Sequence, residues 1–218
     1  MSELDFNVVL RNLPYLWQGL QLSFLLAGLA IGGGILCGAM LAVLRMSSIK
    51  PIAWLAACYV NFFRSVPLIL IIFWIYFLVP LLLGRATGPF LSAVIAFSLF
   101  ETAYYCEIIR AGVQSIPKGQ IHAGVASGMT RMQAMRHIVM PQAFRNMTPI
   151  LLTQSIILFQ DTSLVYVVTL RDFMTSVSTV ANQELRLVEL YLFAAAVYFM
   201  ICFTGSRFVN KVGGGFRR

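Results

Sequence analysis

The 218-residue chain contains 59% hydrophobic and only 11% charged residues, whereas charged residues make up about 25% of an ordinary soluble domain. This composition excludes a soluble domain of the usual kind and indicates a protein that lies mostly in lipid. The formal net charge is +8. Because no basic run accompanies it, the charge is better explained by membrane topology than by nucleic-acid binding, and no nucleic-acid partner is expected.

The cysteines and the amino terminus exclude further classes. The four cysteines lie in apolar stretches without paired or metal-ligand spacing, so neither a disulfide framework nor a metal site is expected; they are Cys37, Cys58, Cys106 and Cys202. Glu3 and Asp5 open the chain, whereas a cleaved signal peptide begins with basic residues. We therefore expect the first apolar segment to be retained as a membrane span.

Apolar runs predict five transmembrane helices in a single all-α membrane domain covering residues 1–218. The runs lie near residues 16–44, 54–83, 90–109, 148–170 and 188–209. At about 20 apolar residues for each helical span, five spans and their connections use up the whole chain.

Two of these runs have internal features. The second is longer than one upright helix needs, and Arg64 and Pro67 interrupt it, so we expect an elbow at the membrane interface followed by the span. The first carries two small-xxx-small pairs, which allow helix backbones to approach closely; the residues are Gly28, Gly32, Gly34 and Gly38.

The basic residues predict the orientation, because cytoplasmic segments retain Lys and Arg. With the amino terminus outside and the carboxyl terminus in the cytoplasm, eleven of the 16 basic residues fall on the inner side and four on the outer side, with Arg64 unassigned. The opposite orientation would invert the rule.

The connection at residues 111–147 is longer than two neighbouring membrane helices need, and it is basic without a single carboxylate. Residues 119–127 are expected to form a short helix closed by Gly128. Thr130 and Gln133 have the spacing of a capping box that starts a second helix. An apolar stripe follows, formed by Met132, Met135, Ile138 and Val139, and Pro141 is expected to end that helix. From these features alone, the helix-Gly-helix knob could lie on anionic lipid headgroups or dock a protein partner.

The knob resembles the cytoplasmic loop of ABC importer permeases, whose pattern is Glu-Ala-Ala, three residues, Gly, nine residues and Ile-x-Leu-Pro. The matching residues are His122, Ala123, Gly124, Gly128, Ile138, Met140 and Pro141. The chain departs from the pattern at His122, Gly124 and Met140, and the histidine removes the usual Glu as a salt-bridge partner.

Other segments extend the resemblance over nearly the whole chain. Residues 59–68, 100–116 and 158–166 are similar to segments of the polar amino acid branch of these permeases. Together with residues 141–145 and 151–154, they most resemble a subunit of glutamate/aspartate importers.

The resemblance implies a type I importer permease in a bacterial inner membrane, carrying no cofactor of its own. It implies three partners: a second permease subunit, identical or paralogous; a separate ATPase dimer that binds ATP and Mg²⁺; and a periplasmic binding protein that delivers the amino acid. No phosphate-binding loop occurs in the sequence, so energy is expected from that ATPase. The residues expected to couple this chain to the ATPase are His122, Ala123, Gly124, Gly128, Arg131, Ile138 and Pro141.

Candidate pathway residues are the ionisable ones at membrane depth, because a charge there is costly and normally faces the bundle interior or water. They are Arg64, Glu101, Glu107, Arg110 and Asp161. Asp161 is the most central and could accept the ammonium group of an amino acid. Arg64 or Arg110 could bind a substrate carboxylate. The alternative for each is an internal ion pair, as Glu107 and Arg110 could form at i,i+3.

Three other functions stay open from the sequence. Glu101, Glu107 and Asp161 could form a proton relay in an ATP-independent carrier or channel. The loop could recruit a cytoplasmic protein to a membrane scaffold. An ABC importer could also carry a different polar amino acid.

Overall fold

The structure is a computed structural model that describes residues 5–84 and 87–216, and every regular element in these ranges is helical. In chain order the elements are α1 (Asn7–Arg11), α2 (Leu13–Arg45), α3 (Lys50–Ser65), α4 (Leu68–Phe73), the π-helix η1 (Trp74–Leu78), α5 (Val79–Leu83), α6 (Pro89–Gln114), α7 (Lys118–Ala126), α8 (Arg131–Ala134), the π-helix η2 (Met135–Val139), α9 (Met140–Asp161), the 3-10 helix η3 (Thr162–Val168), α10 (Phe173–Gln183) and α11 (Leu187–Phe216). The all-α prediction is confirmed.

Four helical segments of the described chain are long and apolar enough to cross a membrane. They are Leu13–Arg45, Pro89–Gln114, Arg131–Val168 and Leu187–Gly214. A fifth results if Lys50–Ser65 and Leu68–Leu82 count as one span bent by 104°. The described chain therefore offers four to five spans.

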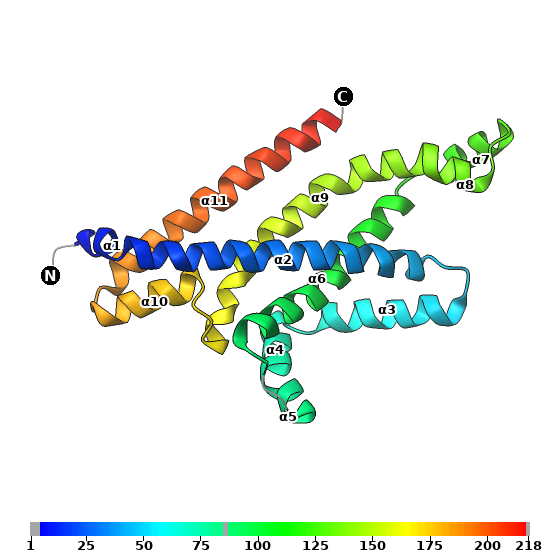
Figure 1. Ribbon diagram of the computed structural model, residues 1–218. Helices are drawn as coiled ribbons and strands as arrows, with labels where there is room; N and C mark the ends of the chain where they lie inside the picture. Colours follow the sequence, from blue (N-terminus) through cyan, green and yellow to red (C-terminus); the bar gives the residue numbers. More distant parts are fainter. Residues whose placement is uncertain (1–4, 85–86, 217–218) are drawn as a thin grey trace.

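The bend in this pair lies at Pro67. Val66 is extended, with φ −107° and ψ 134°, because the residue before a proline is disfavoured in helical conformation. The break falls where the sequence predicted it, but the segment before it is more than an interfacial elbow. Helix α3 packs along α2 and α6 (Figure 1), and Tyr59 donates a hydrogen bond of 2.8 Å to the carbonyl of Leu99 on α6.

Helices α2 and α6 form the most extensive contact in the molecule, and two glycines of α2 make it possible. A Cβ placed on Gly38 would lie 2.8 Å from Tyr105 Cβ and 3.0 Å from the backbone nitrogen of Cys106. A Cβ on Gly34 would lie 2.8 Å from Glu101 Cβ. The predicted close packing is thus correct for this pair of glycines. It is wrong for Gly28 and Gly32, where an added Cβ would meet nothing within 4 Å.

Gly38→Leu is expected to destabilise the chain by about 1–3 kcal/mol, because the new side chain would force α2 away from α6. Gly32→Leu is the matched control on the same helix, since its Cβ has free space. Denaturant titration of the lipid-reconstituted chain measures the difference. Equal unfolding midpoints would show that the α2 and α6 backbones do not need to be so close.

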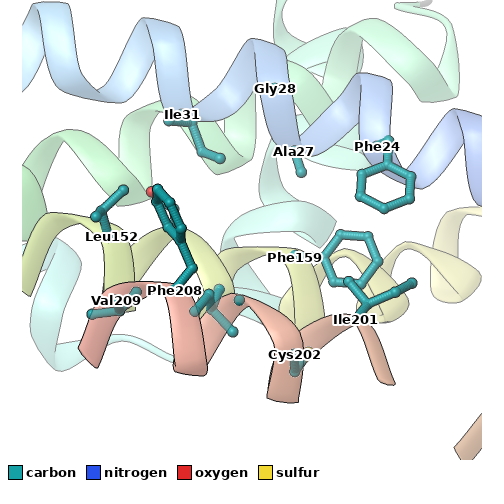
Figure 2. A pocket seen from close by; sticks show the side chains of 13 residues that line it. Phe24, Ala27, Gly28, Ile31, Leu152, Phe159, Ile201, Cys202, Phe208 and Val209 are labelled. Atoms are coloured by element: carbon teal, nitrogen blue, oxygen red, sulfur yellow. The ribbon is translucent and has the colours of Figure 1, made fainter. Parts of the chain in front are cut away.

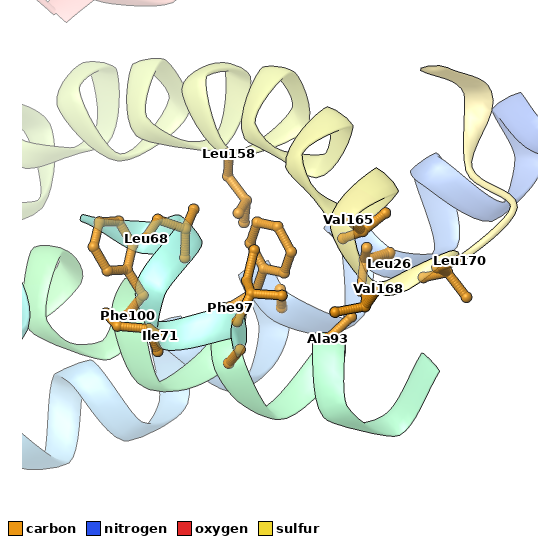
Figure 3. Close-up of a cluster of buried hydrophobic side chains, with 13 residues drawn as sticks. Leu26, Leu68, Ile71, Ala93, Phe97, Phe100, Leu158, Val165, Val168 and Leu170 are labelled. Atoms are coloured by element: carbon orange, nitrogen blue, oxygen red, sulfur yellow. The ribbon is translucent and has the colours of Figure 1, made fainter. Parts of the chain in front are cut away.

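The larger of the two main apolar cores joins α2, α4, α6, α9 and η3 (Figure 3). Phe97 lies at its centre with Leu158 and Val168, and none of the three is more than 1% exposed. Because η3 and α4 both pack into this core, the bent segment after α3 is held against the main bundle rather than left free.

Short helix α10 is anchored by Asp172, which is fully buried at its N-cap. Its carboxylate accepts hydrogen bonds of 3.0 Å from the N–H groups of Met174 and Thr175, as N-cap side chains do. Burial nevertheless raises the pKa of Asp172 above its ordinary value. On α2, Ser23 Oγ accepts the N–H of Phe173 at 3.0 Å, so α10 is tied to the bundle at this end.

The two ends of the bundle differ. The carboxyl end of α2, the connection to α3 and the helices α7 and α8 lie at one end, whereas α1, α10 and the start of α11 lie at the other (Figure 1). The fold therefore gathers Arg45 and Lys50 at the same end as the knob.

Candidate coupling knob and intramembrane polar groups

The knob consists of α7, the turn after it, α8 and η2. Helix α7 ends where Gly128 adopts a positive φ of 86°, a conformation that glycine adopts at little cost. Thr130 then caps α8: its Oγ1 accepts the N–H of Gln133 at 3.2 Å, and its own N–H donates to Gln133 Oε1 at 2.8 Å. The predicted helix-Gly-helix geometry and the capping box are both present.

Gly124 brings the two halves of the knob together. It is buried, and a Cβ placed on it would lie 2.7 Å from Ile138 Cδ1 and 3.2 Å from Ala134 Cβ. A small apolar core of Ile116, Val139 and Ala143 attaches this unit to α6 and α9. Gly124 and Ile138 therefore build the knob and are not its outward-facing contacts.

Pro141 does not end the second helix, contrary to the prediction. The chain continues without a break from α8 through η2 into α9, and Pro141 lies in the first turn of α9. Because proline lacks an N–H and its ring crowds the carbonyl four residues earlier, an ordinary α-turn is disfavoured before it. The wider π-turn of η2 resolves this conflict. The part of the knob after Gly128 is thus continuous with α9.

Met132 also differs from the prediction. It was expected in the packed apolar stripe but is 75% exposed, while Met135, Ile138 and Val139 pack inward. The outward face of the knob has neighbouring exposed residues: His122, Ala123, Val125, Gly128, Met129 and Arg131. It is a mixed apolar and basic surface without a carboxylate.

Among the candidate pathway residues, Glu107 is already paired. Its carboxylate accepts hydrogen bonds from Arg110 on the same helix, with Nε to Oε2 at 3.2 Å, and from Arg45 on α2. The internal ion pair foreseen for Glu107 and Arg110 is present, and Arg45 is a partner that the sequence did not reveal. Two guanidinium groups share one carboxylate, so this network keeps a net positive charge.

Arg64 lies beside this network without a carboxylate of its own among the described residues. Its guanidinium carbon is 5.5 Å from the centroid of the Tyr104 ring, a cation–π distance, and the side chain is exposed at the end of α3. Its charge also acts on Glu107. Together with Arg45 and Arg110, it forms an electropositive cluster on α2, α3 and α6.

Glu101 is enclosed by the bundle and is 0% exposed. Its Oε1 accepts a hydrogen bond of 3.1 Å from Gln154 on α9, and among the described residues Oε2 has no partner. One turn further along α6, Tyr105 Oη lies 3.1 Å from Ser155 Oγ. These polar contacts link α6 to α9, and Gln154 was not recognised from the sequence as a partner.

Asp161 ends α9, two helical turns after Gln154 and on the same face of the helix. It is half-buried, and its carboxylate has neither an ion pair nor a hydrogen bond to any described residue. It is near enough to Glu101 for the two charges to interact. Of the five candidates, Glu101, Asp161 and Arg64 thus have no counter-ion within the described chain, and of these only Asp161 and Arg64 are not fully enclosed.

The structure makes no metal centre from these groups. Within residues 5–84 and 87–216, no three His, Cys, Asp or Glu side chains come together in a way that could hold a metal ion. The geometry instead supports two tasks: docking a partner at the knob, and contacting a charged solute along α3, α6 and α9.

Known proteins resemble the chain over almost its full length. A family model described as binding-protein-dependent transport system inner membrane component matches residues 34–217. The glutamate/aspartate import permease protein GltK of Escherichia coli O6:H1 is 49% identical over 217 residues, which is 96% of this chain and 97% of that protein. The arginine transport system permease protein ArtQ of Bacillus subtilis is 32% identical over 198 residues, or 91% of this chain and 90% of that protein.

Solved structures share the fold. A chain in the crystal structure of an amino acid ABC transporter with histidines has a TM-score of 0.92 and 32% identity, and the match covers 97% of this chain and 99% of that one. The methionine ABC transporter MetNI in an inward-facing conformation has a TM-score of 0.63 at 22% identity, with the same coverage.

Proposed function

The chain belongs to the family of binding-protein-dependent transport system inner membrane components, and on that premise we propose that it is the transmembrane subunit of an ATP-driven importer of glutamate and aspartate. Membership makes it an inner-membrane permease component of the type I ABC importer fold and not an enzyme. The observation that carries the substrate proposal is the 49% identity to a glutamate/aspartate import permease over nearly all of both chains.

The proposed assembly has four kinds of component. This chain pairs with a second permease subunit, identical or paralogous, and a periplasmic binding protein brings the amino acid to the outer end of the bundle. An ATPase dimer, which binds ATP and Mg²⁺, docks on the cytoplasmic knob. The orientation places the amino terminus outside and the carboxyl terminus in the cytoplasm, because most basic residues then lie inside.

The knob suits the transmission of a conformational change. It is continuous with α9, and α9 carries Gln154 and Asp161 further along the same helix. If the ATPase binds the knob with different affinity in its open and closed states, that difference shifts the equilibrium between two packings of the helix bundle. Because Gly124 and the core around Val139 hold α7 on η2, a displacement of the knob moves the end of α9 that bears Asp161.

The two uncompensated charges that are not fully enclosed match the two ends of an acidic amino acid. Asp161 would accept the α-ammonium group, and Arg64 would bind a carboxylate with its planar guanidinium. The surplus positive charge of the Arg45, Glu107 and Arg110 network lowers the electrostatic cost of bringing an anion near α6. Arg110 and Glu107 contribute to this field while paired with each other, and Glu101 acts by holding α6 against α9.

Reconstitution tests the proposal. The complete importer in proteoliposomes, with ATP inside and the binding protein and labelled glutamate outside, is expected to accumulate glutamate only when ATP is present. Unlabelled aspartate should compete and arginine should not. Uptake by this chain without ATP would instead support a carrier or channel, and competition by a different polar amino acid alone would overturn the proposed substrate.

A further inference from the structure

A cavity of about 340 Å³ lies between α2, α9 and α11 (Figure 2), within the range of about 300–1,000 Å³ that ligand pockets occupy. Its lining is almost entirely hydrocarbon: Phe24 and Gly28 come from α2, Phe159 from α9, and Ile201 and Gly205 from α11. Phe24 and Phe159 stack on each other with centroids 4.8 Å apart. The space therefore favours an apolar chain.

The proposed amino acid substrate does not fit this cavity. Ser155 carries the one hydroxyl group in its described lining. That hydroxyl donates to the carbonyl of Leu151 at 3.0 Å and lies 3.1 Å from Tyr105 Oη, so its one donor is already used. An ammonium or carboxylate group placed here would be buried without a partner, which is strongly unfavourable.

A second cavity adjoins the first and is more polar. Val209 lines both. The second has a volume of about 750 Å³ and lies between the start of α9 and the end of α11, with polar side chains from Ser115, Arg145, Asn146 and Asn210. Its described lining includes no carboxylate. Arg145 is exposed and forms no ion pair with any described residue, so it is available to an anion.

An apolar slot that opens onto a basic, hydrogen-bonding cavity matches one kind of ligand. We propose that α2, α9 and α11 bind an anionic phospholipid, with an acyl chain in the apolar cavity and the phosphate beside Arg145, Asn146 and Asn210. In the orientation proposed above, this end of the bundle faces the cytoplasmic leaflet, where basic pockets between helices bind anionic headgroups. A helix from a second permease subunit would fill the apolar part but leave Arg145 without a counter-ion.

Two variants separate the parts of this site. Gly28→Leu fills the apolar cavity, and the backbone accepts it because a Cβ at Gly28 meets nothing within 4 Å. Gly32→Leu is the matched control: it lies one turn further along α2, has the same free space and does not line the cavity. Arg145→Gln removes the charge from an exposed position, and Arg136→Gln is its control on the knob.

Native mass spectrometry of the purified importer, titrated with phosphatidylglycerol or phosphatidylcholine, measures the binding. Wild type is expected to retain phosphatidylglycerol preferentially. Gly28→Leu should weaken its retention about tenfold or more, because the acyl chain has no space. Arg145→Gln should weaken it about fivefold, since a basic residue near the membrane surface contributes about 1 kcal/mol, and should leave phosphatidylcholine unchanged. Both control variants should behave as wild type.

Several results would overturn the proposal. Gly28→Leu could retain phosphatidylglycerol as well as Gly32→Leu does, which would show that the cavity holds no acyl chain. Wild type could retain phosphatidylglycerol and phosphatidylcholine equally, with no change in Arg145→Gln. That result would show that the site does not select an anionic headgroup. Gly28→Cys could crosslink to the second permease subunit, which would show that protein covers the cavity.

Discussion

Asp161→Asn is expected to lower amino acid uptake by about 30-fold or more, because the loss of one partner from a buried, hydrogen-bonded charge pair costs about 2–5 kcal/mol. Asparagine preserves the shape of the side chain at the end of α9 but cannot balance the ammonium group of the substrate. Initial rates at low substrate concentration in the reconstituted importer measure the effect. The decrease should appear with glutamate and aspartate alike, since both carry the α-ammonium group.

The control for this variant is Gln160→Ala, the exposed neighbour of Asp161, which should transport at nearly the wild-type rate. Co-purification of the ATPase with both variants checks that the assembly is intact. Unchanged uptake in Asp161→Asn would assign Asp161 a structural role, even though no described residue pairs with it.

Gly128→Val is expected to lower uptake by about 5- to 30-fold while the chain remains inserted in the membrane. A left-handed conformation costs an L-residue about 1–2 kcal/mol, and valine adds a β-branched side chain to a φ of 86°. The turn relieves this strain by shifting α7 relative to α8, which displaces the surface that the ATPase is proposed to grip. ATPase activity stimulated by the loaded binding protein should fall together with uptake.

Gly119→Val is the matched control for the knob. Gly119 lies in α7, an added Cβ there meets nothing within 4 Å, and its φ is not positive. This variant should keep coupling nearly intact. If Gly128→Val stimulated the ATPase normally, the conformation of the turn would not matter for coupling, and the proposed role of the knob would fail.

The turn and cap of the knob were predictable because their signals are local. A capping box places both partners three residues apart, as Thr130 and Gln133 are. Whether a position can adopt a positive φ depends mainly on the residue at that position, here Gly128. The predicted end at Pro141 was wrong because the consequence of a proline depends on the turn before it, and a π-turn can accommodate what an α-turn cannot. Met132 is exposed although it lies in the same turn as the buried Ala134, because that turn has a packed face and an open face that spacing alone does not distinguish.

Pairings between helices could not be read from the sequence. Arg45 and Glu107 are 62 residues apart, and Glu101 and Gln154 are 53 apart. Whether such side chains meet depends on how closely the helices approach, and for α2 and α6 Gly34 and Gly38 allow an approach in which an added Cβ would lie 2.8 Å from Glu101 and Tyr105. The sequence identified the ionisable residues at membrane depth, but only the fold shows which of them are already neutralised.

By itself the sequence determined that this is a multi-pass membrane protein and that its long basic connection forms a helix-Gly-helix knob. These properties follow from composition and from contacts within a few residues. Only the tertiary structure decided that Glu107 is paired, that Asp161 and Arg64 lack a counter-ion among the described residues, and that Gly28 opens onto a cavity while Gly34 packs against Glu101. Each of these contacts depends on the distance between helices that are far apart in the sequence, and the packing of the bundle sets that distance.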